Sequence, residues 1–326
     1  MDNIQRTPFV RELASSDRKV RDKALESLTL FLKSRRDLEL VELLKIWKGL
    51  FFCFYHSDRP LTQQSLARAL SYTLLPSLPE PILQPFLRAF WITMSRDFHS
   101  LDRLRLDKYL YLIRCYVGAA FEILLKKGLA TTEKRGKNRK ESQQEVGNEG
   151  SFNEKEQPTT NGASKKRKRE DEDDGEEDST WKDLETYISM LEEGPLCPYN
   201  FNPDEPKTKS EKKMPKGPDG IRYHLMDIWL DELEKFATDP EENKEEKQQS
   251  RENGDAKTSS KTKLKLGIPM EILLRPFHRL REKSPNKTVR KRALEVLEDQ
   301  RLIDWGVIEP KKPDGDDQDD EWGGFD

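Results

Sequence analysis

Apolar residues recur at the three- and four-residue spacing of an α-helix from residue 7 to residue 127, and strand-like alternation is almost absent. Helices are expected at 60–75, 79–98 and 101–127. Shorter helices should begin at three capping signals, namely Thr7 with Pro8, Asp17 and Asp37. Because the connections are short, consecutive helices should lie antiparallel. Residues 1–127 are therefore predicted to form an N-terminal array of about six helices.

The helix expected after Asp17 has a distinct apolar face. The residues that fall on this face are Val20, Ala24, Leu28, Phe31 and Leu32. Lys19, Lys23 and Glu26 fall on the opposite side. A helix with such a face buries it against neighbouring helices.

This helix has a partial copy near the end of the chain. Residues 15–28, SSDRKVRDKALESL, match residues 284–297, SPNKTVRKRALEVL, at five pairs: Val20 and Val289, Arg21 and Arg290, Ala24 and Ala293, Leu25 and Leu294, Leu28 and Leu297. The pattern resembles the second helix of HEAT and armadillo repeats, in which a small alanine lets helices approach closely. We therefore predict an all-α fold, a HEAT/armadillo-like helical array with long disordered inserts.

The middle of the chain has a different composition. Between residues 128 and 179 the apolar periodicity stops, and the segment cannot bury enough apolar surface to offset chain entropy. We expect a disordered charged insert there. Residues 180–310 should add C-terminal helices near 181–191 and 221–236 and two final helices within 269–300. These helices should pack on the array, interrupted by a polar insert at 238–263. Residues 311–326 are predicted to be an acidic disordered tail.

Two charged segments have possible roles of their own. The insert contains five consecutive basic residues, which are Lys165, Lys166, Arg167, Lys168 and Arg169. In an accessible segment such a cluster is typical of a nuclear import signal read by import receptors, and the alternative interpretation is a solvated linker. The acidic tail ends with Trp322 and Phe325. It is either a frayed end or a short peptide that docks on a partner.

The charge is unevenly distributed along the 326 residues. Hydrophobic residues make up 34% and charged residues 37% of the chain, more charge than a typical globular domain carries. Residues 1–127 contain 21 Lys and Arg against 14 Asp and Glu, whereas the remainder contains 37 against 47. A basic front and an acidic rear are expected of a protein that contacts both nucleic acid and basic partners.

The sequence offers no catalytic or metal-binding constellation. Cys53, Cys115 and Cys197 form no CxxC pair, which argues against a disulfide framework or zinc site. No phosphate-binding loop, HExxH, GxSxG or dinucleotide motif is present. The most apolar stretch, 109–125, is too short to span a membrane and is expected to be a buried helix. We therefore expect a non-enzyme with no cofactor, no metal, no membrane contact and no small-molecule substrate.

Three runs carry a more specific resemblance: WKGLFFCFYHSDRPLTQQSLA at 47–67, HSLDRLRLDKYLYLIR at 99–114, and GIRYHLMDIWLDELEKF at 220–236. Together they resemble the ribosomal RNA processing protein 1 family, the nucleolar Nop-fifty-two group. The resemblance implies a nucleolar, nuclear scaffold of 60S subunit assembly that supports spacer processing of pre-ribosomal RNA. It also implies other 60S assembly factors as partners, among them a Brix-domain factor and a β-propeller factor. The aromatic exchanges at 54–56 and at Phe98 depart from the family pattern but preserve bulk.

Three groups of basic residues are candidates for contact with RNA or partners. They are Lys19, Lys23, Lys33, Arg35 and Arg36 in the first, Arg103, Arg105 and Lys108 in the second, and Arg290, Lys291 and Arg292 in the third. The first and third could form two basic ridges suited to a sugar-phosphate backbone. Alternatively, Arg21 and Arg290 pair with carboxylates inside the stack and the other side chains are solvated. The second group alternates with Asp102 and Asp107, and could instead form ion pairs that fix a neighbouring helix or loop.

Three functions compete at this point. The first is a structural assembly factor of the large ribosomal subunit. The second is a HEAT-type nuclear transport adaptor that holds basic cargo with its acidic tail. The third, a processing nuclease, is disfavoured because no acidic metal cluster is evident.

Overall fold

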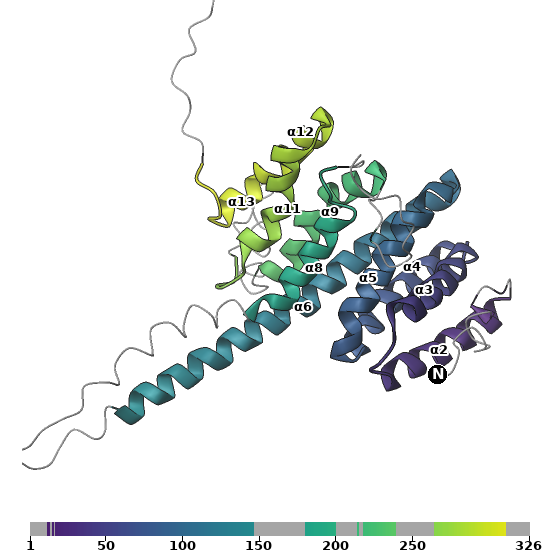
Figure 1. Ribbon diagram of the computed structural model, residues 1–326, viewed down its shortest axis with the longest axis horizontal. Helices are drawn as coiled ribbons and strands as arrows, with labels where there is room; N and C mark the ends of the chain where they lie inside the picture. The colour runs from purple at the N-terminus through teal and green to yellow at the C-terminus, as the bar shows by residue number, and fades with distance from the viewer. Residues whose placement is uncertain are drawn as a thin grey trace, which may run out of the picture.

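The computed structural model describes residues 12–13, 15, 17–146, 180–199, 214, 218–238 and 264–310, and for 135–146 it describes the backbone path alone. Over these residues the fold is an all-α helical array, as predicted, and the extended pairing there is an isolated antiparallel bridge between Thr238 and Leu264. The expected cap at Thr7, the basic cluster at 165–169 and the acidic tail lie outside the described residues. The helices follow one another across the molecule from α2 at one end to α12 and α13 at the other (Figure 1).

Helices α2 (Arg18–Ser34) and α3 (Leu40–Tyr55) open the described array. The Asp17 carboxylate accepts a hydrogen bond from the backbone N–H of Lys19 at 2.9 Å, so Asp17 is the predicted N-cap of α2. The predicted cap at Asp37 is wrong. Helix α3 is capped at Glu39, whose backbone N–H donates to the Glu42 carboxylate at 3.1 Å, and this reciprocal pairing fixes the start two residues later.

The expected helix at 60–75 is divided into shorter pieces. Helix α4 (Pro60–Arg68) continues into a π-helical turn, η2 (Ala69–Thr73), and a 3₁₀ turn, η3 (Leu75–Ser77). In the π turn the backbone N–H of Leu74 donates to the carbonyl of Ala69 at 2.9 Å, five residues back. Pro76 has no backbone N–H and prevents a regular helix from continuing. Helix α5 (Glu80–Asp97) and the 3₁₀ turn η4 (Phe98–Ser100) then complete the predicted 79–98 element.

The core lies where α3, α5 and the long helix α6 (Arg103–Val146) meet. Trp47 of α3 is fully buried, with ring centroids 4.9 Å from Phe90 and 5.2 Å from Tyr116. The predicted buried stretch 109–125 lies in the N-terminal half of α6, and the hydroxyl of Tyr109 donates to the Phe51 carbonyl at 2.8 Å. No helix among the described residues is long and apolar enough to cross a membrane.

The C-terminal helices pack on the other side of α6. They are α8 (Lys182–Glu193), α9 (Asp219–Ala237), α11 (Met270–Lys283), α12 (Lys287–Leu297) and α13 (Gln300–Asp304). Helices α8 and α9 contact α6, and α11 and α12 pack on α8 and α9 respectively. Trp229 of α9 links these layers, because its ring lies 4.9 Å from Phe121 of α6 and 5.0 Å from Phe277 of α11.

The two sequence copies fold in the same way at their first turns. In each, a serine hydroxyl accepts the backbone N–H two residues later, at Asp17 and at Asn286, which then caps the helix. Arg21 donates to the Ser15 carbonyl at 3.0 Å, and Arg290 donates to the Ser284 carbonyl at 2.8 Å. The matching arginines therefore hold the chain that enters each helix by hydrogen bonds to its carbonyl groups.

Helix α6 does not end at residue 127, where the charged insert was expected to begin. It continues to Val146 and leaves the body of the molecule, as Figure 1 shows. Gly128 lies against the indole ring of Trp181, and Leu129 packs on the core. These contacts with a distant segment hold the first part of the extension, which the sequence pattern alone could not indicate.

Gly128→Ala should destabilise the protein, although alanine is the better helix former. In a helix the exchange would ordinarily gain about 1 kcal/mol. Here the new methyl group would overlap the Trp181 ring, and overpacking of this kind costs about 1–3 kcal/mol. In a Trp181→Ala background the same exchange should instead stabilise the fold. Thermal unfolding of the four proteins tests this, and an effect of the same sign in both backgrounds would contradict the packing.

Candidate interaction surfaces

The first predicted basic group lies on the outer face of α2 and on the two residues that follow this helix. Lys19, Lys23, Lys33 and Arg36 are exposed, and Leu30, with 69% of its surface accessible, lies on the same side of the helix. Arg35 is half-buried, since its guanidinium lies 5.7 Å from the Phe31 ring centroid and its Nε is 3.5 Å from the Asp37 carboxylate. Four of the five side chains are thus accessible to a partner.

The third group, on α12, is largely engaged within the protein. Besides the Ser284 contact, Arg290 donates to the Pro285 carbonyl at 3.0 Å. Arg292 donates to the Asp227 carboxylate at 3.1 Å and lies 4.8 Å from the Tyr223 ring centroid. Lys291 is exposed, 3.8 Å from Glu295. Since α2 and α12 lie at opposite ends of the array, the two basic ridges do not form one continuous surface (Figure 1).

The second group forms an ion-pair junction between two parts of the sequence. The Lys108 ammonium is buried and donates to the carbonyls of Tyr55 at 2.8 Å and Ser57 at 3.2 Å and to the Asp58 carboxylate at 3.0 Å. Arg105 donates to Asp58 at 3.2 Å and to Asp102, which also caps the backbone N–H of Arg105. These bonds fasten the start of α6 to the loop between α3 and α4.

This junction changes the interpretation of the second group. Hydrogen bonds from Lys108 and Arg105 hold the pKa of Asp58 below its usual range, and burial lowers the pKa of Lys108. An ammonium group with three protein oxygens and almost no exposed surface cannot also reach a phosphate. Lys108 is therefore engaged in ion pairs that fix a neighbouring loop, whereas Arg105, whose side chain is 27% exposed, stays a predicted contact although it also pairs with Asp58. Arg103 is exposed and stays a prediction.

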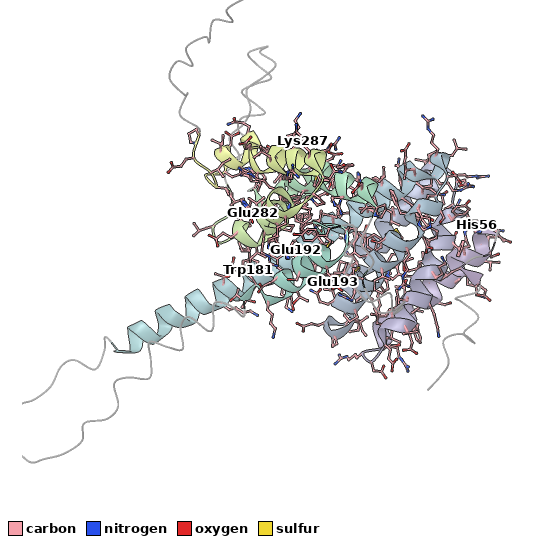
Figure 2. All side chains as sticks on the ribbon, turned by 45° about the horizontal axis from the view of Figure 1, so that its top comes forward. His56, Trp181, Glu192, Glu193, Glu282 and Lys287 are labelled. Carbon is pink, nitrogen blue, oxygen red and sulfur yellow. The ribbon has the colours of Figure 1, made fainter. Side chains whose placement is uncertain are left out.

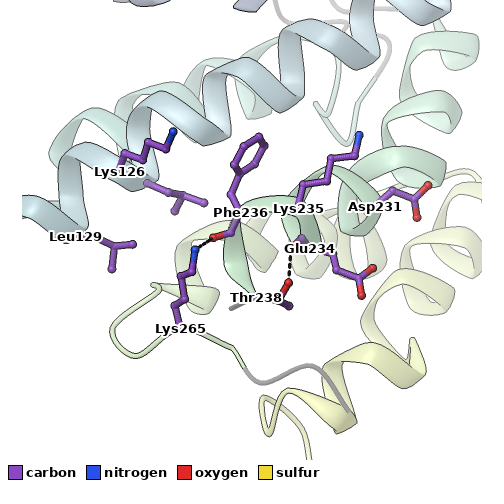
Figure 3. Close-up of a pocket in the computed structure, with 9 residues that line it drawn as sticks. Lys126, Leu129, Asp231, Glu234, Lys235, Phe236, Thr238 and Lys265 are labelled. Carbon is purple, nitrogen blue, oxygen red and sulfur yellow. Dashed lines mark hydrogen bonds between the residues drawn. The ribbon is translucent and has the colours of Figure 1, made fainter. Parts of the chain in front are cut away.

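Two hollows border the end of α9. One, of about 590 Å³, lies between α6, α9 and the segment at Lys265 (Figure 3). Its charged groups are engaged: Lys265 donates to the Phe236 carbonyl at 3.0 Å, and Lys126 pairs with Glu122. Because these charged groups already have partners within the protein, we do not assign a ligand to this hollow.

The second hollow, of about 810 Å³, is the three-helix groove, lined by one face each of α4 with its π turn, α6 and α9. The residues that define it are Arg68, Tyr72, Tyr111, Arg114, Glu232 and Lys235. Sequence reasoning did not single out these residues as a site, because each helix contributes only a few polar positions among apolar ones. A search for arginine and tyrosine at four-residue spacing, as in Arg68 and Tyr72, would have drawn attention to α4.

The fold and these surfaces define a class of protein: an all-α helical array that presents accessible basic side chains on its outer helix. The chain matches the family described as nucleolar protein, Nop52, over residues 4–322, and it belongs to that family. This agrees with the resemblance noted in the sequence and with the predicted nucleolar, nuclear location.

Named relatives support the same family. Human ribosomal RNA processing protein 1 homolog B is 27% identical over 236 residues, which cover 70% of this chain and 22% of the relative. The mouse homolog B is 42% identical over 123 residues, which cover 36% of this chain and 17% of the relative. Human ribosomal RNA processing protein 1 homolog A is 35% identical over 125 residues, which cover 37% of this chain and 27% of the relative. The matched part of this chain thus spans between 17% and 27% of the length of these relatives.

Proposed function

We propose that this chain is a nucleolar assembly factor of the large (60S) ribosomal subunit, a non-catalytic scaffold in pre-60S particles that supports processing of pre-ribosomal RNA spacers. The observation that carries the proposal is the family match over residues 4–322. The relatives are named for ribosomal RNA processing, and we extend that role to this chain. Pre-ribosomal RNA and neighbouring assembly factors, with a Brix-domain factor and a β-propeller factor among them, are the proposed partners.

The charge distribution supports contact with RNA at α2. Several basic side chains elsewhere in the described part of the chain are engaged in ion pairs between helices, as Arg275 is with Glu192 and Arg114 is with Glu232. In contrast, Lys19, Lys23 and Lys33 lie in one exposed row on α2. Such a row suits a sugar-phosphate backbone, which is bound by charge without base specificity.

Depletion of the protein from cells tests the proposed function. Pre-ribosomal RNA that retains its internal spacers should accumulate, and large subunits should fall relative to small ones. The full-length protein should restore both. Normal spacer processing after complete depletion would contradict the proposal.

Changing Lys19, Lys23 and Lys33 to Gln should weaken binding to pre-ribosomal RNA fragments and flatten the dependence of affinity on salt. Each lost phosphate contact lowers the slope of log affinity against log salt by about 0.7 for single strands and about 0.9 for duplexes. Affinity measured over a salt series gives the slope directly.

A matched control removes the same number of charges at the other end of the array. Arg281, Lys283 and Lys287 are exposed near α11 and α12, and their change to Gln should leave the slope closer to that of the parent. Equal slopes for parent, α2 variant and control, in proteins with unchanged unfolding, would show that α2 does not contact RNA.

A further inference from the structure

The three-helix groove has the form of a built site. Each helix turns residues at spacings of three and four toward it, such as Tyr111, Arg114 and Cys115 from α6. The wall contributed by α4 runs into the π turn at 69–73. Helical turns of this kind are rare, and they occur frequently at functional sites.

The floor of the groove is a buried carboxylate that is already satisfied. The side chain of Glu232 is 1% exposed and accepts hydrogen bonds from Arg114 at 2.5 Å and from Lys235 at 2.6 Å. Gly118 lies close beside it, where a side chain would strike the Glu232 carboxylate and the Tyr72 hydroxyl. The floor is therefore closely packed, and a ligand would sit above it.

The rim provides an accessible cation beside an aromatic ring. Arg68 is exposed, and its Nε donates to the Tyr111 hydroxyl at 3.1 Å. Among the described residues no carboxylate forms an ion pair with Arg68, in contrast to Arg114 and Lys235. The rings of Tyr72, Tyr111 and Phe236 are half-buried in the walls, so part of each remains available for contact.

We propose that the three-helix groove binds one unstacked nucleotide of single-stranded RNA, with its phosphate at Arg68 and its base against Tyr111. Sequence-tolerant RNA sites combine aromatic rings for stacking with cations for the backbone, and the groove joins both at one edge. This inference rests on the proposed function, which supplies RNA as the ligand.

A peptide with acidic and aromatic side chains would also combine negative charge with planar rings, but the groove favours it less. Such a peptide would bring several carboxylates toward the carboxylate of Glu232. A nucleotide places one negative charge at the rim and an uncharged ring above the floor.

Short oligoribonucleotides and the full chain test the proposal. Tyr111→Leu keeps bulk but removes the aromatic face, and it should weaken binding of a single-stranded ten-nucleotide RNA about tenfold, within the range of one stacked base. Its salt slope should equal that of the parent. Arg68→Gln should weaken binding and also lower the slope by about 0.7, the contribution of one phosphate contact on a single strand.

Matched variants outside the groove set the baseline. Phe52→Leu and Arg59→Gln alter an exposed aromatic ring and an exposed cation near the α3–α4 loop, and they should bind RNA as the parent does. Arg68→Lys, which keeps the charge, should retain the parental slope. Unfolding curves confirm that each protein is folded, and a duplex of equal length should compete poorly because its bases are stacked.

Two results would overturn the inference. One is unchanged affinity and slope in both groove variants. The other is displacement of the RNA by a peptide of residues 313–326, with that peptide's affinity falling in the same groove variants, which would make the groove a site for acidic peptides. The depletion experiment measures spacer processing and does not depend on either result. A failure of the groove proposal can therefore be distinguished from a failure of the proposed function.

Discussion

Trp47→Ala is expected to lower the free energy of unfolding by about 3–5 kcal/mol, the usual loss for a buried tryptophan. The indole contributes packing to α3, α5 and α6 at once, because its ring contacts Phe86, Phe90 and Tyr116. A loss of this size is a large part of the stability of a typical domain. Denaturant unfolding of the full chain measures it.

Leu30→Ala is the control for this experiment. Leu30 is also a large apolar residue but is 69% exposed, so its truncation should change stability by no more than about 0.5 kcal/mol. If Trp47→Ala unfolded at the same denaturant concentration as the parent, the packing of Trp47 between α3, α5 and α6 would be contradicted.

Glu192→Ala should have the second largest effect, since it removes the buried carboxylate that joins α8 to α11. The side chain is 4% exposed and accepts hydrogen bonds from Arg275 at 3.1 Å and Arg279 at 2.7 Å. Breaking a fully buried pair costs about 3–5 kcal/mol. Both arginines are partly exposed and can regain water, so we expect about 2–3 kcal/mol.

The adjacent residue offers a closely matched control. Glu193 lies next to Glu192 on the same helix (Figure 2). Its side chain is 45% exposed and pairs with Arg88. Glu193→Ala should cost at most about 1 kcal/mol, as is usual for surface ion pairs. Equal losses from the two substitutions, measured by thermal unfolding, would contradict a buried link between α8 and α11.

The strongest helices could be predicted from sequence because their apolar pattern reflects burial on one face. The stretch 109–125 is the best example, and it forms the buried part of α6. Two features depended on contacts that local sequence does not encode. The extension of α6 past residue 127 relies on Trp181, and the π turn at 69–73 interrupts a pattern that reads as a continuous helix.

For the candidate surfaces, the sequence allowed us to predict which residues are charged but not which of them are exposed. The sequence showed Lys19 and Lys108 as similar basic residues, yet one is exposed and the other is buried. The difference arises because Lys108 lies beside Asp58 and the carbonyls that end α3, fifty residues earlier in the chain. Pairing of this kind depends on the packing of α6 against the α3–α4 loop.

The proposed role as a scaffold in pre-60S particles is tested most directly by sedimentation of nuclear extracts. The account predicts that the protein co-migrates with large pre-ribosomal particles and moves to light fractions when the RNA is digested. A nuclear transport adaptor would remain in light fractions with import receptors whether or not the RNA is intact. Finding the untreated protein there, and absent from the large particles, would contradict the account.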